Sequence, residues 1–447
     1  MNEKVAKALS YVDEKYTAAA ARGKRKKTTY WIGAAAAVLA LAFLFHTVGT
    51  PLVLTAHAVA TASAPRHAGQ ADSDTAKAAA AQLADFFTAG SAQFLTTEGS
   101  ENLLWSPVNA YIGLSMLTEL TAGESQQQIL DLFGAADADT LRAQVRAVWE
   151  SVYYNGNKGN EVSVLANSLW LEKGLSYHRA AIDRLADDYY ASVYQGDLGS
   201  ATMNRAIAAW IDSNTAGFLK NATANIQLSP ETVLALYSTI YFQAKWYDQF
   251  SSNHNTQAVF HTPDGDVTAT FMNKSLAQMT YYWGDTFGAV SLSLKNGSRM
   301  WFILPDEGRT TADVLSDGQY MQMLQQQNWE NDKYMMVNLS VPKFDVSSTM
   351  DLKDGLQQLG VTDVFTLGAA DFSAITGDVP LFLSAANQSV RVQIDEEGVK
   401  AAAYIELPAC GSAAPPDEII DFVLDRPFLF AITKGSLPLF VGTVNRP

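Results

Sequence analysis

One segment near the C-terminus, residues 395–412, carries two patterns that ordinary strands do not combine. Its sequence is DEEGVKAAAYIELPACGS, and from Val399 every second residue is apolar as far as Ala409. Such alternation is typical of a strand with one buried face. The segment nevertheless contains Gly398 and Pro408 and runs on into Gly-Ser-Ala-Ala-Pro-Pro, which favours a loop. We therefore predict a loop whose side chains are suited to the interior of a sheet.

Three short motifs, one in this segment and two after it, form a recognisable set. After Asp395 the segment reads Glu396, Glu397, Gly398 and Val399, and it continues after one lysine with Ala401, Ala402 and Ala403. The sequences DRPFLF at 425–430 and LFVG at 439–442 follow. Together they resemble the reactive-centre-loop hinge, the C-terminal strand signature and the closing motif of the serpins, a family of serine protease inhibitors.

Further motifs resemble the serpin pattern in order, from about residue 75 to the end of the chain. They include SPVN at 106–109, ANSLW at 166–170, a long strand ending at Trp246, WFILP at 301–305, VPKF at 341–344 and ADFS at 370–373. The resemblance implies an α+β serpin fold of three β-sheets and eight or nine helices, with an exposed reactive-centre loop. Trp246 then stands at the breach, the point of the main sheet where a strand would enter.

The N-terminal part differs from the rest in composition. Residues 1–28 hold eight Lys/Arg against three Asp/Glu, and residues 30–48 contain none of these four types. At about 1.5 Å per residue this apolar run spans roughly 28 Å, enough to cross a bilayer core. Positive residues before it indicate a cytoplasmic N-terminus. We predict a cytoplasmic tail over 1–28, a transmembrane signal-anchor helix over 29–49, a flexible tether over 50–73 and the serpin domain over 74–447.

The domain would then lie outside the cytoplasm, on a single-pass membrane protein whose anchor contacts the lipid bilayer. This arrangement is compatible with a bacterial cell surface. A cleavable signal peptide is the alternative, since Ala56-His57-Ala58 and Ala60-Thr61-Ala62 have the small-x-small form of cleavage sites. In that case the domain would be secreted.

Charge and cysteine content exclude several kinds of partner. The chain has a net charge of −15, and because residues 1–28 carry +5 the remainder carries −20. Such an acidic body disfavours nucleic acid and polyanionic sugars as partners. With Cys410 as its single cysteine, the chain can form no intrachain disulfide. We expect a monomer without a metal or other cofactor.

No catalytic motif accompanies the family resemblance. Of the six histidines, only His178, His254 and His261 lie in the predicted domain, and none belongs to a recognisable catalytic pattern. Cys410 lacks the neighbouring base that a nucleophile needs, so we interpret it as a small neutral loop residue. We therefore do not expect an enzyme.

The resemblance implies a reactive bond between Ser412 and Ala413, with the neighbouring bonds as alternatives. In serpins a serine protease cuts this bond, becomes covalently attached, and is trapped while the cut loop inserts into the main sheet. Residues 409–414 are small and uncharged, which suits the shallow pocket of an elastase-like or subtilisin-like enzyme. The predicted partner is an extracytoplasmic serine protease. The alternative is a non-inhibitory serpin-fold binding module that proteases cut as a plain substrate.

Two features depart from the serpin pattern. Serpins keep a polar cluster of two Ser, one Asn and one His beneath the main sheet, and the matching positions here are Ser106, Asn109, Ser238 and Gln388. Asn109 and Ser238 can exchange roles, so we predict a repacked but still polar cluster. With Gln in place of His, nothing in the cluster titrates near pH 6. Pro408 removes one ladder hydrogen bond late in the inserting segment, and we expect insertion to survive that loss.

Overall fold

The computed structural model of the chain describes residues 56–62, 74–96, 99–155, 161–220, 226–325, 329–377, 380–384, 386–399 and 418–447. The predicted tail and transmembrane helix lie outside these residues, as do most of the predicted tether and residues 400–417. Within the described ranges, no helix is both long enough and apolar enough to cross a membrane.

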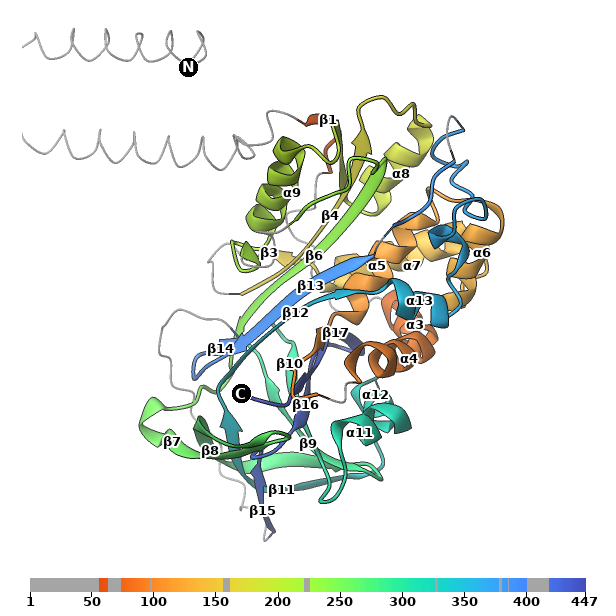
Figure 1. Ribbon diagram of the computed structural model, residues 1–447. Coiled ribbons are helices and arrows are strands. Elements are labelled where there is room, and N and C mark those ends of the chain that lie inside the picture. Colours follow the sequence, from red (N-terminus) through yellow and green to blue (C-terminus); the bar gives the residue numbers. More distant parts are fainter. Residues whose placement is uncertain are drawn as a thin grey trace, which may run out of the picture. The chain divides into compact units, whose positions relative to one another are not determined.

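The main sheet has eight strands, most of which are labelled in Figure 1. Along the sheet they are β1 (His57–Ala60), β5 (Ala191–Gly196), β4 (Val162–Glu172), β6 (Leu234–Lys245), β14 (Gly398–Val399), β13 (Asn387–Ile394) and β12 (Phe344–Asp351), with β3 (Tyr154–Asn155) paired to β4. β4 and β6 form one long antiparallel ladder, and β12 and β13 form another. Among the described strands only β14 pairs with both halves, because β6 and β13 pair with it and not with each other.

The second sheet has nine strands. Their order is β15 (Ile419–Val423), β11 (Asp332–Pro342), β8 (Gly265–Trp283), β9 (Phe287–Ser293), β10 (Arg299–Pro305), β16 (Phe428–Lys434), β17 (Leu437–Val444) and β2 (Leu104–Trp105), with β7 (Thr256–Thr262) paired to β8. The sequence predicted three sheets, whereas the described strands form two. The reason is β8, whose 19 residues pair with β7 and β11 and finally with β9. Because β8 has all three partners, one continuous sheet replaces two separate ones.

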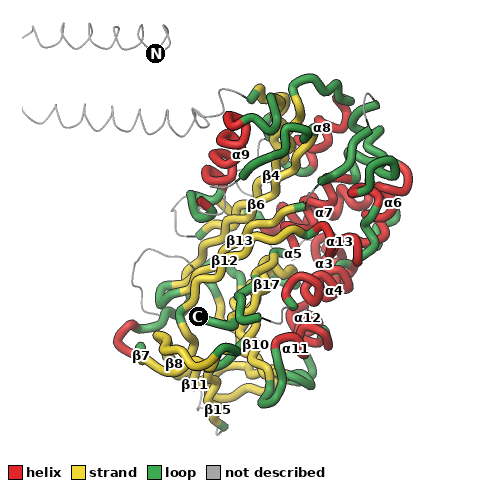
Figure 2. The backbone as a smooth tube through the Cα atoms, viewed as in Figure 1, coloured by secondary structure: helices red, strands yellow, loops and turns green. Residues whose placement is uncertain are grey.

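The described residues form ten α-helices, against the eight or nine predicted. They are α3 (Asp74–Gln82), α4 (Ala84–Leu95), α5 (Pro107–Leu117), α6 (Gly123–Leu132), α7 (Ala138–Val152), α8 (Arg179–Asp188), α9 (Ala201–Asn214), α11 (Thr311–Asp317), α12 (Gln319–Gln325) and α13 (Lys353–Gln358). Leu83 alone separates α3 from α4, which accounts for the additional helix. In Figure 2 most helices gather along one side of the strands, whereas α9 lies apart, over β4 and β6. The predicted α+β class is confirmed.

The helix α5 forms the centre of the core. Its sequence is apolar nearly all round, and ten of its eleven residues are buried, as the sequence predicts. Ser106 stands at its N-cap and Pro107 at its first position, where a missing N–H costs nothing. Because α5 packs against β6 and against β17, it connects the main sheet to the second sheet.

The sequence predicted a flexible tether over 50–73, but residues 57–60 of that segment form β1, and for them the prediction is wrong. β1 pairs antiparallel with β5 at the edge of the main sheet, and the preceding Ala56 packs into a small core with Trp170 and Met203. An edge strand offers unpaired backbone groups to any segment that can lie along it, so a short stretch with little strand signal of its own becomes ordered. The folded unit therefore begins before residue 74.

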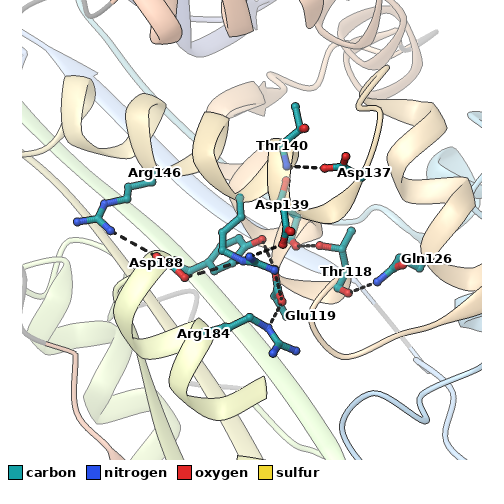
Figure 3. A network of polar contacts seen from close by, with 12 residues as sticks. Thr118, Glu119, Gln126, Asp137, Asp139, Thr140, Arg146, Arg184 and Asp188 are labelled. Carbon is teal, nitrogen blue, oxygen red and sulfur yellow. Dashed lines mark hydrogen bonds and ion pairs between the residues drawn. The ribbon is translucent and has the colours of Figure 1, made fainter. Parts of the chain in front are cut away.

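A buried carboxylate joins helices beside the main sheet (Figure 3). Glu119 is 2% exposed and accepts hydrogen bonds from Arg142 of α7, Arg184 of α8 and the hydroxyl of Tyr189. The distance from Arg142 Nε to Glu119 Oε1 is 2.8 Å. A buried charge is tolerated when it is paired and hydrogen-bonded as fully as this one. The network therefore fixes α7 and α8 against the segment that follows α5.

Replacing Glu119 by Gln should destabilise the protein by about 3 kcal/mol or more, because the two guanidinium groups lose their buried counter-charge. The control is Glu150→Gln, since Glu150 pairs with Arg146 at a half-exposed position of α7 and its loss should cost less than about 1 kcal/mol. Urea unfolding monitored by circular dichroism measures both effects. Equal midpoints for the two variants would contradict the central role of Glu119.

Candidate functional site

Trp246 binds the start of the predicted hinge. It follows β6 directly, it is fully buried, and its indole Nε1 donates a hydrogen bond to the carbonyl oxygen of Asp395 at 2.8 Å. The backbone N–H of Trp246 donates to the carbonyl of Glu397, and that of Phe250 donates to the carbonyl of Glu396, each at 3.1 Å. The Trp246 ring meets Phe250 edge-on. The first hinge residues are therefore held mainly through backbone atoms.

The next two hinge residues form β14, which lies between β6 and β13. Gly398 and Val399 pair with Lys245 and Ala244 of β6, and Val399 also pairs with Ile394 of β13. Val399 is 2% exposed and faces the core, the side that the alternation assigns to it. A Cβ atom on Gly398 would lie 2.4 Å from the carbonyl oxygen of Ala244. Only glycine allows the backbone to approach β6 this closely.

Glu396 is fixed by its side chain as well as by its backbone. Its Oε1 lies 2.6 Å from Nζ of Lys343 and accepts a hydrogen bond from Nδ2 of Asn255. Partial burial opposes ionisation, but the hydrogen bonds from Lys343 and Asn255 outweigh that effect and lower the pKa of the Glu396 carboxyl. Neither partner was predicted. Lys343 lies in the VPKF motif, which identified a strand boundary without indicating what the lysine contacts.

The predicted polar cluster lies at the N-terminus of α5. The backbone N–H of Ser106 donates to Oε1 of Gln388 at 2.8 Å, and Nε2 of Gln388 donates to the Ser106 carbonyl at 3.1 Å. The Ser106 hydroxyl donates to the carbonyl of Leu439 in β17 at 2.6 Å. All three contacts are buried, so this end of α5 is bound both to β13 and to the second sheet.

One helical turn further along α5, Asn109 binds β6. Its Nδ2 donates to the carbonyl of Ser238 at 3.2 Å, and its Oδ1 accepts from the Ser238 hydroxyl at 2.6 Å. That hydroxyl also lies 2.7 Å from Oδ1 of Asn167 in β4, so two amide oxygens share one proton. Ser106 and Asn109 are three positions apart and lie on the same side of the helix. One helix end therefore holds both β6 and β13.

Asn167 was not predicted to belong to this cluster. The ANSLW motif identified it only as part of a strand. The available signal was an amide side chain within a largely apolar run, because such a group must find a buried partner.

A cavity of about 140 Å³ lies beside the cluster. Its lining includes residues of α5, of the start of β6, of the start of β13 and of the segments that precede these two strands, among them Asn109, Leu236, Ser238, Ala386 and Gln388. A dry cavity of about 150 Å³ accepts a benzene molecule, so this one has room for an aliphatic side chain. It lies between the same two strands as β14, towards their other end.

The remaining predicted site residues lie outside the part of the chain that the structure describes. They are Ala401, Ala402 and Ala403 of the hinge and the reactive bond Ser412–Ala413. Across the described ranges, no group of three or more His, Cys, Asp or Glu is arranged to hold a metal ion.

This geometry defines a class of protein: the main sheet is divided along β6 and β13, and the first residues of a loop from the same chain lie between the two halves. Comparison with protein families gives the same result. The family model described as "Serpin (serine protease inhibitor)" matches residues 82–447, and the chain belongs to the serpin family.

Individual relatives agree with this assignment. Alpha-1-antiproteinase of Callosciurus caniceps is 28% identical over 355 residues, covering 77% of this chain and 83% of that protein. Plasminogen activator inhibitor 1 of Sus scrofa is 26% identical over 392 residues, covering 85% and 95%. Among solved structures, the thermophilic serpin tengpin in its native state matches with a TM-score of 0.74 at 23% identity, covering 88% of this chain and all of that one. Human thyroxine-binding globulin matches with a TM-score of 0.70 at 23% identity, covering 83% and 99%. At this identity the two structures support the fold alone.

Replacing Gly398 by Val should displace β14, because the new side chain would overlap the backbone of Ala244 and Lys245. We expect amide hydrogen exchange at Val399 to become about tenfold faster or more, since the local pairing opens. Gly174→Val is the matched control, because a Cβ atom there meets nothing within 4 Å. Unchanged exchange in the Gly398 variant would contradict the close approach described above.

The hinge should weaken in acid. Because the pKa of Glu396 is lowered from its ordinary value of 4.5, its contribution to stability is complete above that pH and is lost as the pH falls through the lowered value. Hydrogen exchange of the peptide 394–399, corrected for the intrinsic pH dependence, should be constant from pH 7 to 5 and rise below 4.5. In Glu396→Gln the rise should disappear. A transition near pH 6 would instead contradict the prediction that nothing in the polar cluster of Ser106, Asn109, Ser238 and Gln388 titrates there.

Proposed function

We propose that this protein traps serine proteases irreversibly as a suicide-substrate inhibitor whose cut reactive-centre loop inserts into the main sheet. One observation carries the proposal. β14 is bonded on both sides, to β6 and to β13, which is the position that an inserted strand occupies. Membership of a family described as serine protease inhibitors supports the class of activity.

The register of β14 predicts where each later loop residue would lie if the strand continued. Val399 pairs with Ala244 and Ile394, so Ile405, six positions further on, would lie between Ser238 and Gln388. In the same register Leu407 would lie between Leu236 and Ala386. All four of these flanking residues line the cavity beside the polar cluster.

The side-chain sizes in the loop agree with this register. Ala401 and Ala403 would face positions that are flanked by large side chains, each at most 6% exposed: Ile240, Phe242, Val390 and Val392. Small residues therefore occur where the flanking residues leave little space, and the larger Ile405 and Leu407 occur where the cavity is. Full burial of each larger side chain would stabilise the inserted form by about 1.5–3 kcal/mol.

Insertion also requires β6 and β13 to separate. Some Cα atoms of the two strands lie within 8 Å of one another, whereas strands on either side of a third are about 9.5 Å apart. Ser106 holds β13 and Asn109 holds β6 from one turn of α5. These contacts resist separation until the advancing loop supplies new backbone hydrogen bonds.

The proposed target protease and the proposed location of the inhibitor rest on the sequence. Residues 409–414 are small and uncharged, which supports an elastase-like or subtilisin-like protease as the target. If residues 29–49 anchor the chain in the bilayer, the inhibitor acts at the outer surface of the membrane, and cleavage after the anchor would release it. Both the anchor and a bacterial origin stay predictions.

A denaturing gel tests the proposed function. The full chain, incubated with an elastase-like serine protease, should form a covalent complex that survives denaturation. The nicked chain should also unfold at a higher temperature than the intact one. Clean cleavage without a complex and without a gain in thermal stability would contradict trapping and favour a non-inhibitory binding module.

Replacing Ile405 by Glu should convert the inhibitor into a substrate, because insertion would bury a carboxylate between Ser238 and Gln388. The number of inhibitor molecules consumed per protease molecule trapped should rise about tenfold or more. Glu406→Gln is the control, since residue 406 would face outward in this register. If both variants trap equally well, the register is wrong.

Replacing Ser412 by Arg should transfer inhibition towards trypsin-like proteases, which require a basic residue before the cut. The rate of complex formation with a trypsin-like enzyme should rise by about two orders of magnitude or more, in line with the discrimination that a pocket built for a charge provides. An unchanged target spectrum would show that the cut lies at another bond.

A further inference from the structure

Phe218 lies across both halves of the main sheet. Its ring meets the ring of Tyr241 in β6 nearly edge-on, with 6.2 Å between centroids. The guanidinium carbon of Arg391 in β13 lies 4.5 Å from the centroid of the same ring, and Nη1 of Arg391 donates to the Phe218 carbonyl at 3.3 Å. One residue from outside the sheet therefore contacts the two strands that insertion must separate.

The end of α9 directs Phe218 to this position. After Asn214 the chain passes through Ala216 at φ 50° and Gly217 at φ 72°, both in the left-handed region. The Gly217 N–H donates to the carbonyl of Asp212 at 2.7 Å, which closes the helix end. A non-glycine residue in this region is strained, so the turn is maintained by what surrounds it. Phe218, 8% exposed, is the first buried side chain after the turn.

Arg391 is itself held in place from the other side. Its Nε and Nη2 donate to the two carboxylate oxygens of Asp345 in β12, at 2.8 and 2.6 Å. This bidentate pair fixes the plane of the guanidinium group, which is why it can stack on the Phe218 ring. A series of contacts thus connects β12 to β13, β13 to Phe218, and Phe218 to β6.

The contact lies at the level of the sheet that the loop would reach just beyond Val399. In the register of β14, the loop residue that would lie between Tyr241 and Arg391 is Ala402. That residue is three positions beyond Val399, where the described strand ends. An additional strand there would move Tyr241 and Arg391 apart by about one strand spacing, roughly 4.8 Å. Phe218 could then keep its contact with one of them and not with both.

We propose that Phe218 and Arg391 form a clasp across β6 and β13 that controls the entry of the loop, and that Arg391 thereby determines how an attacked loop divides between trapping and release. The inference rests on the proposed function. In the intact protein the clasp keeps the loop from advancing beyond Val399. After the loop is cut, the clasp must open before Ala402 can pair.

Two rates should change when the clasp is weakened. The intact chain should convert faster to a loop-inserted, heat-resistant form without any protease. A cut loop should also insert faster, so that fewer attached proteases escape and fewer inhibitor molecules are consumed for each one trapped. A merely structural role for Arg391 would move the second quantity the other way, because a poorly folded inhibitor behaves as a substrate.

The experiment uses the full chain with the variants Arg391→Met and Arg391→Lys, and Arg179→Met as the control. Met keeps the length of the stem and removes the charge and the hydrogen bonds, whereas Lys restores a cation without the bidentate pair. Arg179 pairs with Asp183 at exposed positions of α8, and neither residue belongs to β6 or β13. Each protein is incubated intact somewhat below its unfolding temperature, and the loss of trapping and the gain of heat resistance are followed with time.

We expect Arg391→Met to convert about five- to tenfold faster than the natural chain, Arg391→Lys to lie between them, and Arg179→Met to match the natural chain. Conversion of Arg391→Met at the natural rate, while the natural chain traps its protease, overturns the clasp and leaves the proposed function standing. Loss of trapping in Arg391→Met without a heat-resistant product also overturns it, since that shows a general loss of stability. If the natural chain neither traps nor becomes heat-resistant, the proposed function fails and the clasp fails with it.

Discussion

The pairing of Gly398 and Val399 with β6 on one side and β13 on the other is the contact on which the site depends. On their other sides these strands are paired over most or all of their length, β6 with β4 and β13 with β12. The edges that face each other within the sheet therefore provide a template for one more strand, and such edges readily accept an extended segment. Because side chains alternate along a strand, seating Val399 inward decides which face every later residue of the loop would take.

The sequence was most informative where a short-range pattern decides the outcome. Alternation assigned Val399 to the inner face, and the residue is 2% exposed there. The nearly all-round apolar sequence of α5 likewise indicates a buried helix, and ten of its eleven residues are buried. Contacts between residues that are distant in the sequence were harder to predict. The partners of Glu119 come from two later helices, and Asn167 meets Ser238 only because β4 and β6 pair in one particular register. No local pattern encodes that register.

The differences in architecture have a similar origin. β1 exists because β5 leaves an edge free, a property of the assembled sheet and not of residues 57–60. The expected second and third sheets are continuous because β8 is long enough to pair first with β7 and β11 and then with β9. The contact between Arg391 and Phe218 was not predicted, because it follows from the left-handed turn after α9. The motifs thus predicted the elements, while tertiary pairing decided how far each element extends.

In the proposed register the advancing loop meets the contacts between the two halves in a fixed order. Trp246 and Glu396 hold its start, and the clasp of Phe218 and Arg391 would be opened next, opposite Ala402. The ties of α5 to Ser238 and Gln388 would follow, opposite Ile405. Alanine is the residue at the first two inward positions after Val399, so the early steps would bury little apolar area and yield little energy. The energy barrier to insertion would therefore lie early, at the opening of the clasp. The stabilisation from burial would come late, because the large side chains reach their cavity only after the clasp has opened. In the proposed mechanism such an order would keep an intact loop from inserting, and it would make insertion irreversible once the loop has been cut.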